Sequence, residues 1–134
     1  MKFIDARGRR RNLPNSTKYK VDWEADSRSK LQTEVKRLVR PYWEGQFVYE
    51  ELPVLGTRLS IDLYNATLEV AIEVDGKQHF EYNKFFHGGN RMNFLEQLQR
   101  DEKKDSFCRE NGITLHRICE GENLEEVVKK LLDT

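Results

Sequence analysis

The sequence predicts an α/β protein of the α+β type with a mixed sheet, and three observations predict this fold class. Runs in which apolar and polar residues alternate indicate four strands, at residues 46–52, 58–64, 67–75 and 113–118. Helical spacing of apolar residues indicates three helices, at about 26–39, 91–111 and 122–132. Short turns join the first three strands, whereas a long helix precedes the fourth. We therefore expect an antiparallel meander and then a strand parallel to its neighbour.

Length and composition indicate one globular domain. The chain has 134 residues, of which 37% are hydrophobic and 34% charged, and its formal net charge is zero. This balance is not that of a disordered chain. No apolar run approaches membrane-spanning length, and the first residues lack the apolar core of a signal peptide. Cys108 and Cys119 have no histidines at zinc spacing, so we expect reduced thiols in a cytoplasmic protein of a bacterial or phage-infected cell.

Residues 1–25 are basic and show little periodicity. Gly8, Pro14 and Asn15 interrupt regular structure, so we expect an extended arm before a single domain at 26–134. The cations of the arm are Lys2, Arg7, Arg9, Arg10, Arg11, Lys18 and Lys20. Such an arm suits phosphate contacts, which give affinity without sequence readout. The alternative is a solvated tail without a partner.

The first helix is expected to end before Pro41, because proline interrupts helical hydrogen bonding. Three residues are candidate N-caps, namely Asp26, Ser27 and Ser29. The apolar stripe consists of Leu31, Val35, Leu38 and Val39. Glu34 lies beside this stripe. Taken alone, it would form an exposed ion pair with a neighbouring Lys or Arg.

The third expected strand ends in carboxylates. Its alternating residues are Leu68, Val70, Ile72 and Val74 on one face, and Glu69, Ala71, Glu73 and Asp75 on the other. Glu73 and Asp75 therefore project the same way, beside the strand that carries Asp62. Three carboxylates at such a short distance repel one another unless a cation lies between them. A site made of oxygen ligands favours Mg²⁺ or Mn²⁺. We expect Asp62, Glu73 and Asp75 to bind such an ion.

A segment rich in aromatic residues and glycine follows, at residues 79–90. Loops of this length are usually functional, so we expect a flap that faces the substrate. Basic residues in and beside the flap would contact phosphates, namely Lys77, Lys84 and Arg91. The aromatic rings would stack on bases or, alternatively, pack as a small satellite core. The helix after the flap has an expected buried side of Phe94, Leu95, Leu98, Phe107 and Cys108.

The element order and the carboxylates, over roughly residues 26–119, resemble the PD-(D/E)XK nuclease superfamily, whose shared core is αβββαβ. In that family an Asp opens the second core strand, and an acidic residue and a Lys lie on the third. Asp62 matches the Asp and Glu73 the acidic residue, but Asp75 stands at the Lys position and Ile61 replaces the preceding Pro. The resemblance implies a restriction-endonuclease-like core followed by a C-terminal helix.

Very-short-patch mismatch repair endonucleases and EDxHD homing endonucleases depart from the family in the same way, and the chain is similar to them. Their five roles are filled here, in order, by Glu34, Asp62, Glu73, His79 and Asp101. The resemblance implies that Asp62 and Glu73 hold the metal and that Glu34 acts through water. His79 would be the general base, and Asp101 would accept its other imidazole N–H.

Two further side chains complete the expected catalytic set. Lys104 lies one turn after Asp101 and would touch a phosphate, and Gln78 would position water or substrate. In an alternative register, Asp75-Gly76-Lys77 forms the acidic-x-Lys motif and Lys77 takes the catalytic role. Taken singly, His79 is an ordinary loop histidine and Asp101 a helix-surface ion-pair partner. The ordered set of five argues against these readings.

The expected function is that of a Mg²⁺-dependent endonuclease acting on double-stranded DNA, site-specific and of the homing or mismatch-nicking type. One alternative is a junction resolvase with the same core, which would act on branched DNA as a homodimer. A second is a non-catalytic DNA-binding module that keeps the nuclease fold, because the third-strand Lys is missing. An RNase would use the same site.

Overall fold

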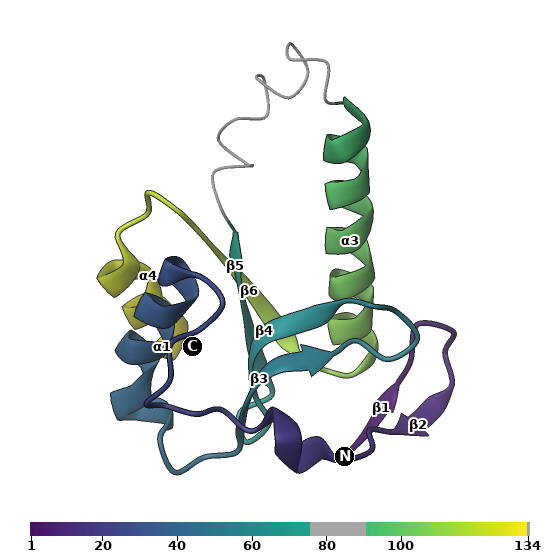
Figure 1. The fold of residues 1–134 in the computed structure, drawn as a ribbon, viewed down its shortest axis with the longest axis horizontal. Coiled ribbons are helices and arrows are strands. Elements are labelled where there is room, and N and C mark those ends of the chain that lie inside the picture. The colour runs from purple at the N-terminus through teal and green to yellow at the C-terminus, as the bar shows by residue number, and fades with distance from the viewer. Residues whose placement is uncertain (76–90, 134) are drawn as a thin grey trace.

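The computed structural model describes residues 1–75 and 91–133, which form three layers (Figure 1). The central layer is a four-stranded sheet of order β3-β4-β5-β6. Its strands are β3 (Val48–Pro53), β4 (Ser60–Asn65), β5 (Val70–Asp75) and β6 (Thr114–Cys119). The first three are antiparallel, whereas β6 runs parallel to β5. The predicted meander and the parallel fourth strand are therefore confirmed.

Helices cover both faces of this sheet. One face carries α1 (Lys30–Trp43) and α4 (Leu124–Leu132), and the other carries α3 (Arg91–Glu110) (Figure 1). Within the described ranges, every helix is too short or too polar to cross a bilayer. Since both faces are covered, polar residues that alternate along β5 are buried rather than solvated, as Glu73 and Asp75 are.

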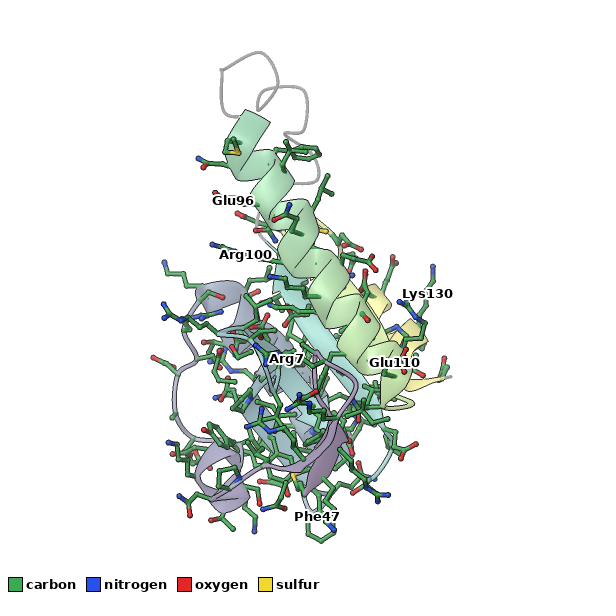
Figure 2. All side chains as sticks on the ribbon, turned by 90° about the vertical axis from the view of Figure 1, so that its right-hand side faces the viewer. Arg7, Phe47, Glu96, Arg100, Glu110 and Lys130 are labelled. Atoms are coloured by element: carbon green, nitrogen blue, oxygen red, sulfur yellow. The ribbon has the colours of Figure 1, made fainter. Side chains whose placement is uncertain are left out.

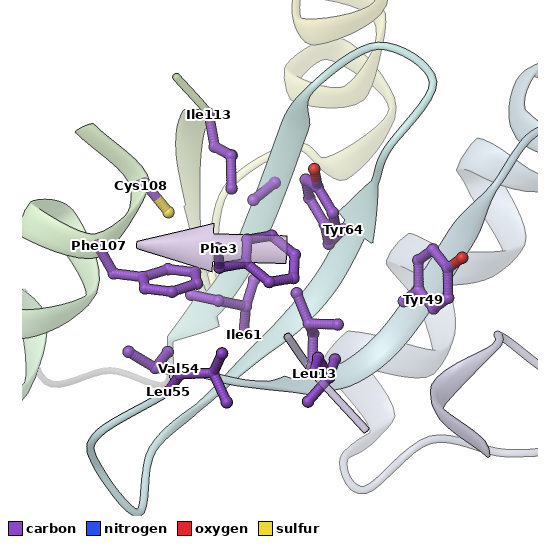
Figure 3. Packing of buried hydrophobic residues seen from close by; sticks show 12 residues of the cluster. Phe3, Leu13, Tyr49, Val54, Leu55, Ile61, Tyr64, Phe107, Cys108 and Ile113 are labelled. Atoms are coloured by element: carbon purple, nitrogen blue, oxygen red, sulfur yellow. The ribbon is translucent and has the colours of Figure 1, made fainter. Parts of the chain in front are cut away.

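Two clusters of buried side chains lie on the two faces. On the α1 and α4 side, Val35 and Val39 pack with Leu63 and Ile72 of the sheet. On the α3 side, Phe3 lies 5.5 Å from Phe107 and 6.1 Å from Tyr64, measured between ring centroids (Figure 3). Each fully buried side chain of this size contributes roughly 1.5–3 kcal/mol to stability.

The first 25 residues are folded, so the prediction of an extended arm is wrong. β1 (Lys2–Ile4) and β2 (Arg10–Asn12) form an antiparallel hairpin, and Ser16–Tyr19 form a 3-10 helix. Phe3 and Leu13 are buried in the cluster on the α3 side. Each of these strands has only three residues, and single apolar residues stand among charged ones. The sequence therefore shows no periodicity that would indicate the hairpin.

α1 begins and ends later than predicted. Ser29, one of the three candidate N-caps, accepts a hydrogen bond from the backbone N–H of Gln32 at 3.1 Å. Pro41 lies inside the helix, which continues to Trp43, so the predicted stop is wrong. Trp43 is 1% exposed. Burial of its indole offsets the helical hydrogen bond that Pro41 cannot make.

The turn between β4 and β5 is longer than predicted. The Asn65 side chain accepts a hydrogen bond from the backbone N–H of Leu68 at 3.0 Å, and Glu69 has a φ of 56°. Leu68 is exposed and β5 begins only at Val70. The predicted strand from residue 67 is therefore wrong in its first three residues, which form the turn.

α3 extends beyond the sheet. Phe107 and Cys108 are buried as predicted, but Leu95 and Leu98 are 39% and 47% exposed, so the predicted buried side is wrong there. Figure 2 shows the half that carries Glu96 and Arg100 projecting away from the strands. A helix of 20 residues spans about 30 Å, whereas a strand of 6 residues spans only about 20 Å.

Candidate active site

β4 and β5 separate where Asp62 and Glu73 lie. Regular pairing runs from Asn65–Val70 to Leu63–Ile72 and then stops. One more step in this register would put Asp62 opposite Glu73, and two carboxylates in that position repel each other. The two residues instead bond to the opposite backbone. The Asp62 N–H donates to Glu73 Oε2 at 2.8 Å, and the Val74 N–H donates to Asp62 Oδ2 at 2.8 Å.

Each carboxylate therefore does what a strand carbonyl does elsewhere in the ladder. It satisfies a backbone donor that would otherwise be buried without a partner. Asp62 and Glu73 are only 3% exposed each. Hydrogen bonds to the backbone of the neighbouring strand therefore help to fix the positions of both side chains.

Glu51 brings a third carboxylate to the same place, and sequence reasoning missed it. Pairing between β3 and β4 omits the Glu51–Asp62 step, and Glu51 has a φ of 55°. Its Oε2 accepts from the Ser60 hydroxyl at 2.9 Å, and its Oε1 accepts from Gln32 Nε2 at 3.1 Å. The left-handed conformation costs a non-glycine residue about 1 kcal/mol. No feature of the sequence indicates such a bend.

Lys104 of α3 forms an ion pair with Glu73. Its Nζ contacts Glu73 Oε1, and the two side chains are 15% and 4% exposed. Both oxygens of Glu73 therefore have partners, the ammonium of Lys104 and the N–H of Asp62. The third-strand Lys expected two residues after Glu73 is replaced by Asp75. In this chain an ammonium group reaches Glu73 from the facing helix instead.

Arg117 of β6 connects the acidic residues of α3 to the end of β5, and sequence reasoning missed it. Its Nη1 lies 2.6 Å from Asp105 Oδ1, and its Nε lies 3.9 Å from Asp75 Oδ2. Its Nη2 donates to the backbone carbonyl of Asp101 at 3.2 Å and lies 3.9 Å from Asp101 Oδ1. A polar residue on an alternating strand looks solvated in the sequence, but α3 covers this face.

Two neighbouring side chains hold Asp101 in position. Besides Arg117, Gln97 Nε2 donates to Asp101 Oδ1 at 3.0 Å. The predicted partner of Asp101, His79, lies outside the described residues. So do Lys77, Gln78 and Lys84, and their roles stay predictions. Arg91 begins α3, but its side chain is not among those described.

A cleft of about 1110 Å³ opens beside Asp62 and Asp75, between the start of α1 and the turn before α4. Glu34 of α1 also lines this cleft, so the structure brings it to the same space as Asp62. The walls carry both charges, from Arg28, Lys30, Arg37, Glu120, Glu122 and Glu125. Glu73 is not part of the lining and pairs with Lys104 of α3.

Arg28 lies at the mouth of the cleft. Its guanidinium approaches Asp62 Oδ1 at 3.5 Å and Glu51 Oε2 at 3.6 Å, while 69% of the side chain stays exposed. An exposed guanidinium beside a buried carboxylate can contact an anion that enters the cleft. Sequence reasoning did not select Arg28, because one arginine in a polar stretch is not distinctive.

The surroundings of Asp62 oppose its charge. Burial first, and then the negative charge of Glu73, raise the pKa of Asp62 to about 8. The hydrogen bond from the Val74 N–H and the charge of Lys104 act in the opposite direction but are weaker. A carboxyl group with this pKa is mostly protonated at neutral pH. A cation placed beside it would favour the ionised form.

The described residues contain no group of three acids, histidines or cysteines arranged to hold a metal. The predicted trio of Asp62, Glu73 and Asp75 is thus not brought together as one ligand set. Asp62 and Asp75 share the cleft, whereas Glu73 is engaged by Lys104. Two carboxylates fit Mg²⁺, which is usually bound by one or two of them together with water and substrate phosphates.

The predicted DNA contacts at the N-terminus lie on the hairpin, on the 3-10 helix and, for Lys20, just after that helix. The side chains of Arg7, Arg9, Arg10, Arg11, Lys18 and Lys20 are all exposed. Lys18 Nζ lies 5.2 Å from the centre of the Tyr19 ring. Cys108 and Cys119 form no disulfide.

Comparison with known proteins finds viral relatives. The chain is 37% identical over 75 residues to Uncharacterized protein 033L of Invertebrate iridescent virus 3, and 41% identical over 63 residues to Uncharacterized protein 094L of Frog virus 3. These matches cover 56% and 47% of this chain but only 38% and 41% of the relatives, so the chain matches less than half of each relative's length. No family model matches the chain, and no solved structure matches it.

Proposed function

We propose that this chain is a metal-dependent DNA endonuclease with a restriction-endonuclease-like core. The observation that carries the proposal is the pair of buried carboxylates, Asp62 and Glu73, at the point where β4 and β5 separate beside an open cleft. The element order α1, β3, β4, β5, α3, β6 is that of the αβββαβ core. Glu34 on α1 and Asp101 on α3 lie on the elements that the EDxHD pattern requires.

Asp62 and Asp75 are the residues that would hold the ion, with Glu34 acting through water. Glu73 holds the Asp62 backbone and, if released from Lys104, is a further ligand. A bound Mg²⁺ or Mn²⁺ supplies charge neutralisation at the scissile phosphate and lowers the pKa of a bound water. Arg28, at the mouth of the cleft, would bind a phosphate oxygen.

Proton transfer is assigned to His79, which would accept the proton of the attacking water. Asp101 would accept the other imidazole N–H and so orient the ring. Arg117 is a positioning residue in this scheme, because it binds the carbonyl of Asp101 and also approaches Asp75. Lys104, which lies next to Glu73, would stabilise the negative charge that develops during the reaction.

The substrate is proposed to be double-stranded DNA cut at specific sites, in a homing or mismatch-nicking role. Support comes from the order Glu34, Asp62, Glu73, His79 and Asp101 along the chain. Branched DNA cut by a homodimer is the resolvase alternative, and the choice of substrate in the assay separates the two.

A second candidate function is a DNA-binding module without catalysis. One observation favours it, namely that Lys104 neutralises Glu73 and leaves two acids in the lining of the cleft near β4 and β5. Such a module would bind DNA equally well with Mg²⁺ and with EDTA.

The test is cleavage of supercoiled plasmid and of a four-way junction in Mg²⁺, Mn²⁺ or EDTA. Wild type is compared with Asp62→Asn and Glu73→Gln, which remove charge but keep shape. Matched controls are Asp133→Asn and Glu110→Gln, which make the same changes at exposed helix ends. We expect metal-dependent cutting by wild type and controls. We expect a loss of at least about 100-fold in both site variants, the typical effect of losing an electrostatic catalytic group.

Each outcome assigns a function. Discrete plasmid cuts support the site-specific role, and a preference for the junction supports the resolvase. Cutting that survives in both site variants contradicts the assignment of the site. DNA binding that is retained in EDTA, with no cutting in any metal, selects the non-catalytic module.

A further inference from the structure

The turn of the N-terminal hairpin is organised around one buried carboxylate. Asp5 Oδ1 accepts the backbone N–H groups of Arg7 and Arg9, both at 2.9 Å. The Asp5 N–H donates to the carbonyl of Arg9 at 2.8 Å, and the Gly8 N–H donates to the carbonyl of Asp5 at 3.0 Å. The Asp5 side chain is 2% exposed. The turn is therefore held in one shape by its own hydrogen bonds.

Three arginines share a hollow with this carboxylate. Arg7, Arg9 and Arg11 line a hollow of about 300 Å³ together with Asp5 and Gly56. Only Arg11 pairs with Asp5, at 3.5 Å between Nη1 and Oδ2. Arg7 and Arg9 form no ion pair with any residue that the structure describes. The formal charge of the hollow is three positive minus one negative, so two positive charges remain for an anion.

Besides the packing of Phe3 and Leu13, backbone hydrogen bonds fasten the described part of the hairpin to the body at two places. The Ala6 N–H donates to the carbonyl of Leu55 at 2.9 Å, in the turn between β3 and β4. Asn111, just after α3, accepts from the Ile4 N–H at 2.7 Å and donates to the Ile4 carbonyl at 2.9 Å. The backbone that carries the arginines is thus ordered before any ligand arrives, which lowers the entropy lost on binding.

We propose that this hollow binds one backbone phosphate of duplex DNA. Guanidinium groups present paired N–H donors that match phosphate oxygens, and two unpaired arginines beside one shielded carboxylate suit a single negative charge. The hollow adjoins the turn that leads into β4, the strand of Asp62. A phosphate held there would fix the register of the duplex relative to the catalytic cleft. The inference rests on the proposed function for the choice of DNA as partner.

The experiment measures binding of a labelled duplex by fluorescence anisotropy in EDTA, at several salt concentrations. The test variant is Arg7→Gln with Arg9→Gln. The matched control is Lys129→Gln with Lys130→Gln, which removes the same charge from the exposed face of α4. A third variant, Arg7→Lys with Arg9→Lys, keeps the charge and removes the paired donors. Circular dichroism checks that each variant is folded.

We expect the glutamine variant of the hollow to weaken binding about 10-fold near 0.1 M salt, and to lower the slope of log affinity against log salt by about 1. The control should stay within about twofold of wild type, and the lysine variant should lie between. Equal losses in the hollow and in the control would overturn the proposal, because they would show only general charge attraction. Unchanged binding in the glutamine variant would overturn it as well.

A further arm separates duplex phosphate from free phosphate. We expect inorganic phosphate to compete no better than chloride at equal ionic strength. Strong competition that is lost in the arginine variant would assign the hollow to free phosphate and overturn the duplex assignment. No step in this experiment uses cleavage. A wild type that binds DNA but never cuts it contradicts only the endonuclease, whereas cutting with binding unaffected in the variant contradicts only the hollow.

Discussion

At the scale of single residues, the surroundings of Asp62 disfavour its ionised form. It is buried next to Glu73, and its pKa is raised to about 8. In the unfolded chain the carboxyl group ionises at its ordinary pKa of 3.8. Between these two values the folded protein binds more protons than the unfolded chain does. The free energy of unfolding therefore falls as the pH rises through this range.

Asp62→Asn should remove this pH dependence. In EDTA, we expect the variant to match wild type near pH 4 and to be more stable by on the order of 2 kcal/mol at pH 8. The asparagine oxygen can still accept the Val74 N–H. Urea unfolding at several pH values measures the effect, with Asp133→Asn as the control. A constant difference between Asp62→Asn and wild type at all pH values would contradict the raised pKa.

Lys104 and Glu73 should be coupled. Lys104→Met leaves a buried carboxylate without its cation, which we expect to cost about 3 kcal/mol of unfolding free energy at neutral pH. Glu73→Gln in the same chain removes the unpaired charge, so the double variant should be more stable than Lys104→Met alone. Urea unfolding of the four proteins gives the coupling energy. Additive effects would show that the ion pair contributes nothing.

The sequence can indicate the environment of a residue only where its near neighbours along the chain form a pattern. Glu34 was selected through the family resemblance, and the site roles of Glu34, Asp62 and Asp75 stay predictions. The positions of Asp62 and Asp75 on two neighbouring strands were predictable, because apolar and polar residues alternate around them. Lys36 was not. It is 2% exposed, and its Nζ donates to the carbonyls of Asp22 and Ala25 and to Glu50. Partners that lie on other segments leave no local pattern.

At the scale of elements, the strands and helices lie close to where the sequence predicted them, whereas the junctions between them do not. Among the residues that the structure describes, periodicity located the four strands of the central sheet and the helices α1, α3 and α4 to within a few residues. The N-terminal hairpin was missed, because strands of three residues are too short to repeat an alternating pattern. The separation of β4 from β5 was also missed, since it results from two acids meeting across strands. The predicted burial of α3 was wrong where the helix extends beyond the sheet.

The contact between hairpin and sheet can be tested at Gly56. A Cβ placed there would lie 3.2 Å from the backbone nitrogen and the Cβ of Ala6, and the φ of Gly56 is +88°. Gly45 has a similar φ of +96°, but a Cβ there would meet nothing within 4 Å. Both Gly→Ala variants carry a cost of about 1 kcal/mol for a left-handed alanine. Only Gly56→Ala also forces the hairpin and the β3–β4 turn apart.

We therefore expect Gly56→Ala to lose about 1 kcal/mol more than Gly45→Ala in urea unfolding. Faster hydrogen exchange at the Ala6 N–H, which bonds to Leu55, should accompany the loss. Equal stability of the two variants would mean that the hairpin yields without cost and is not fastened as described.

At the scale of the whole molecule, a ligand that binds only the folded state must stabilise it. If Mg²⁺ occupies the cleft between Asp62 and Asp75, the melting temperature should rise with its concentration. The gain is about 2.7 kcal/mol when the free ion exceeds its dissociation constant 100-fold. The rise should be absent in Asp62→Asn and present in Asp133→Asn. An equal rise in all three proteins would indicate general ion binding, and no rise would argue against a metal at this site.

The bond between Ile4 and Asn111 also has a consequence for synthesis on the ribosome. The hairpin is translated early relative to the residues that hold it in place, because Phe107 and Asn111 follow Phe3 and Ile4 by more than 100 positions. β3, β4 and β5 are neighbours along the chain and can pair as they emerge, because closing short loops is fast. The hairpin therefore docks only after α3 has left the exit tunnel.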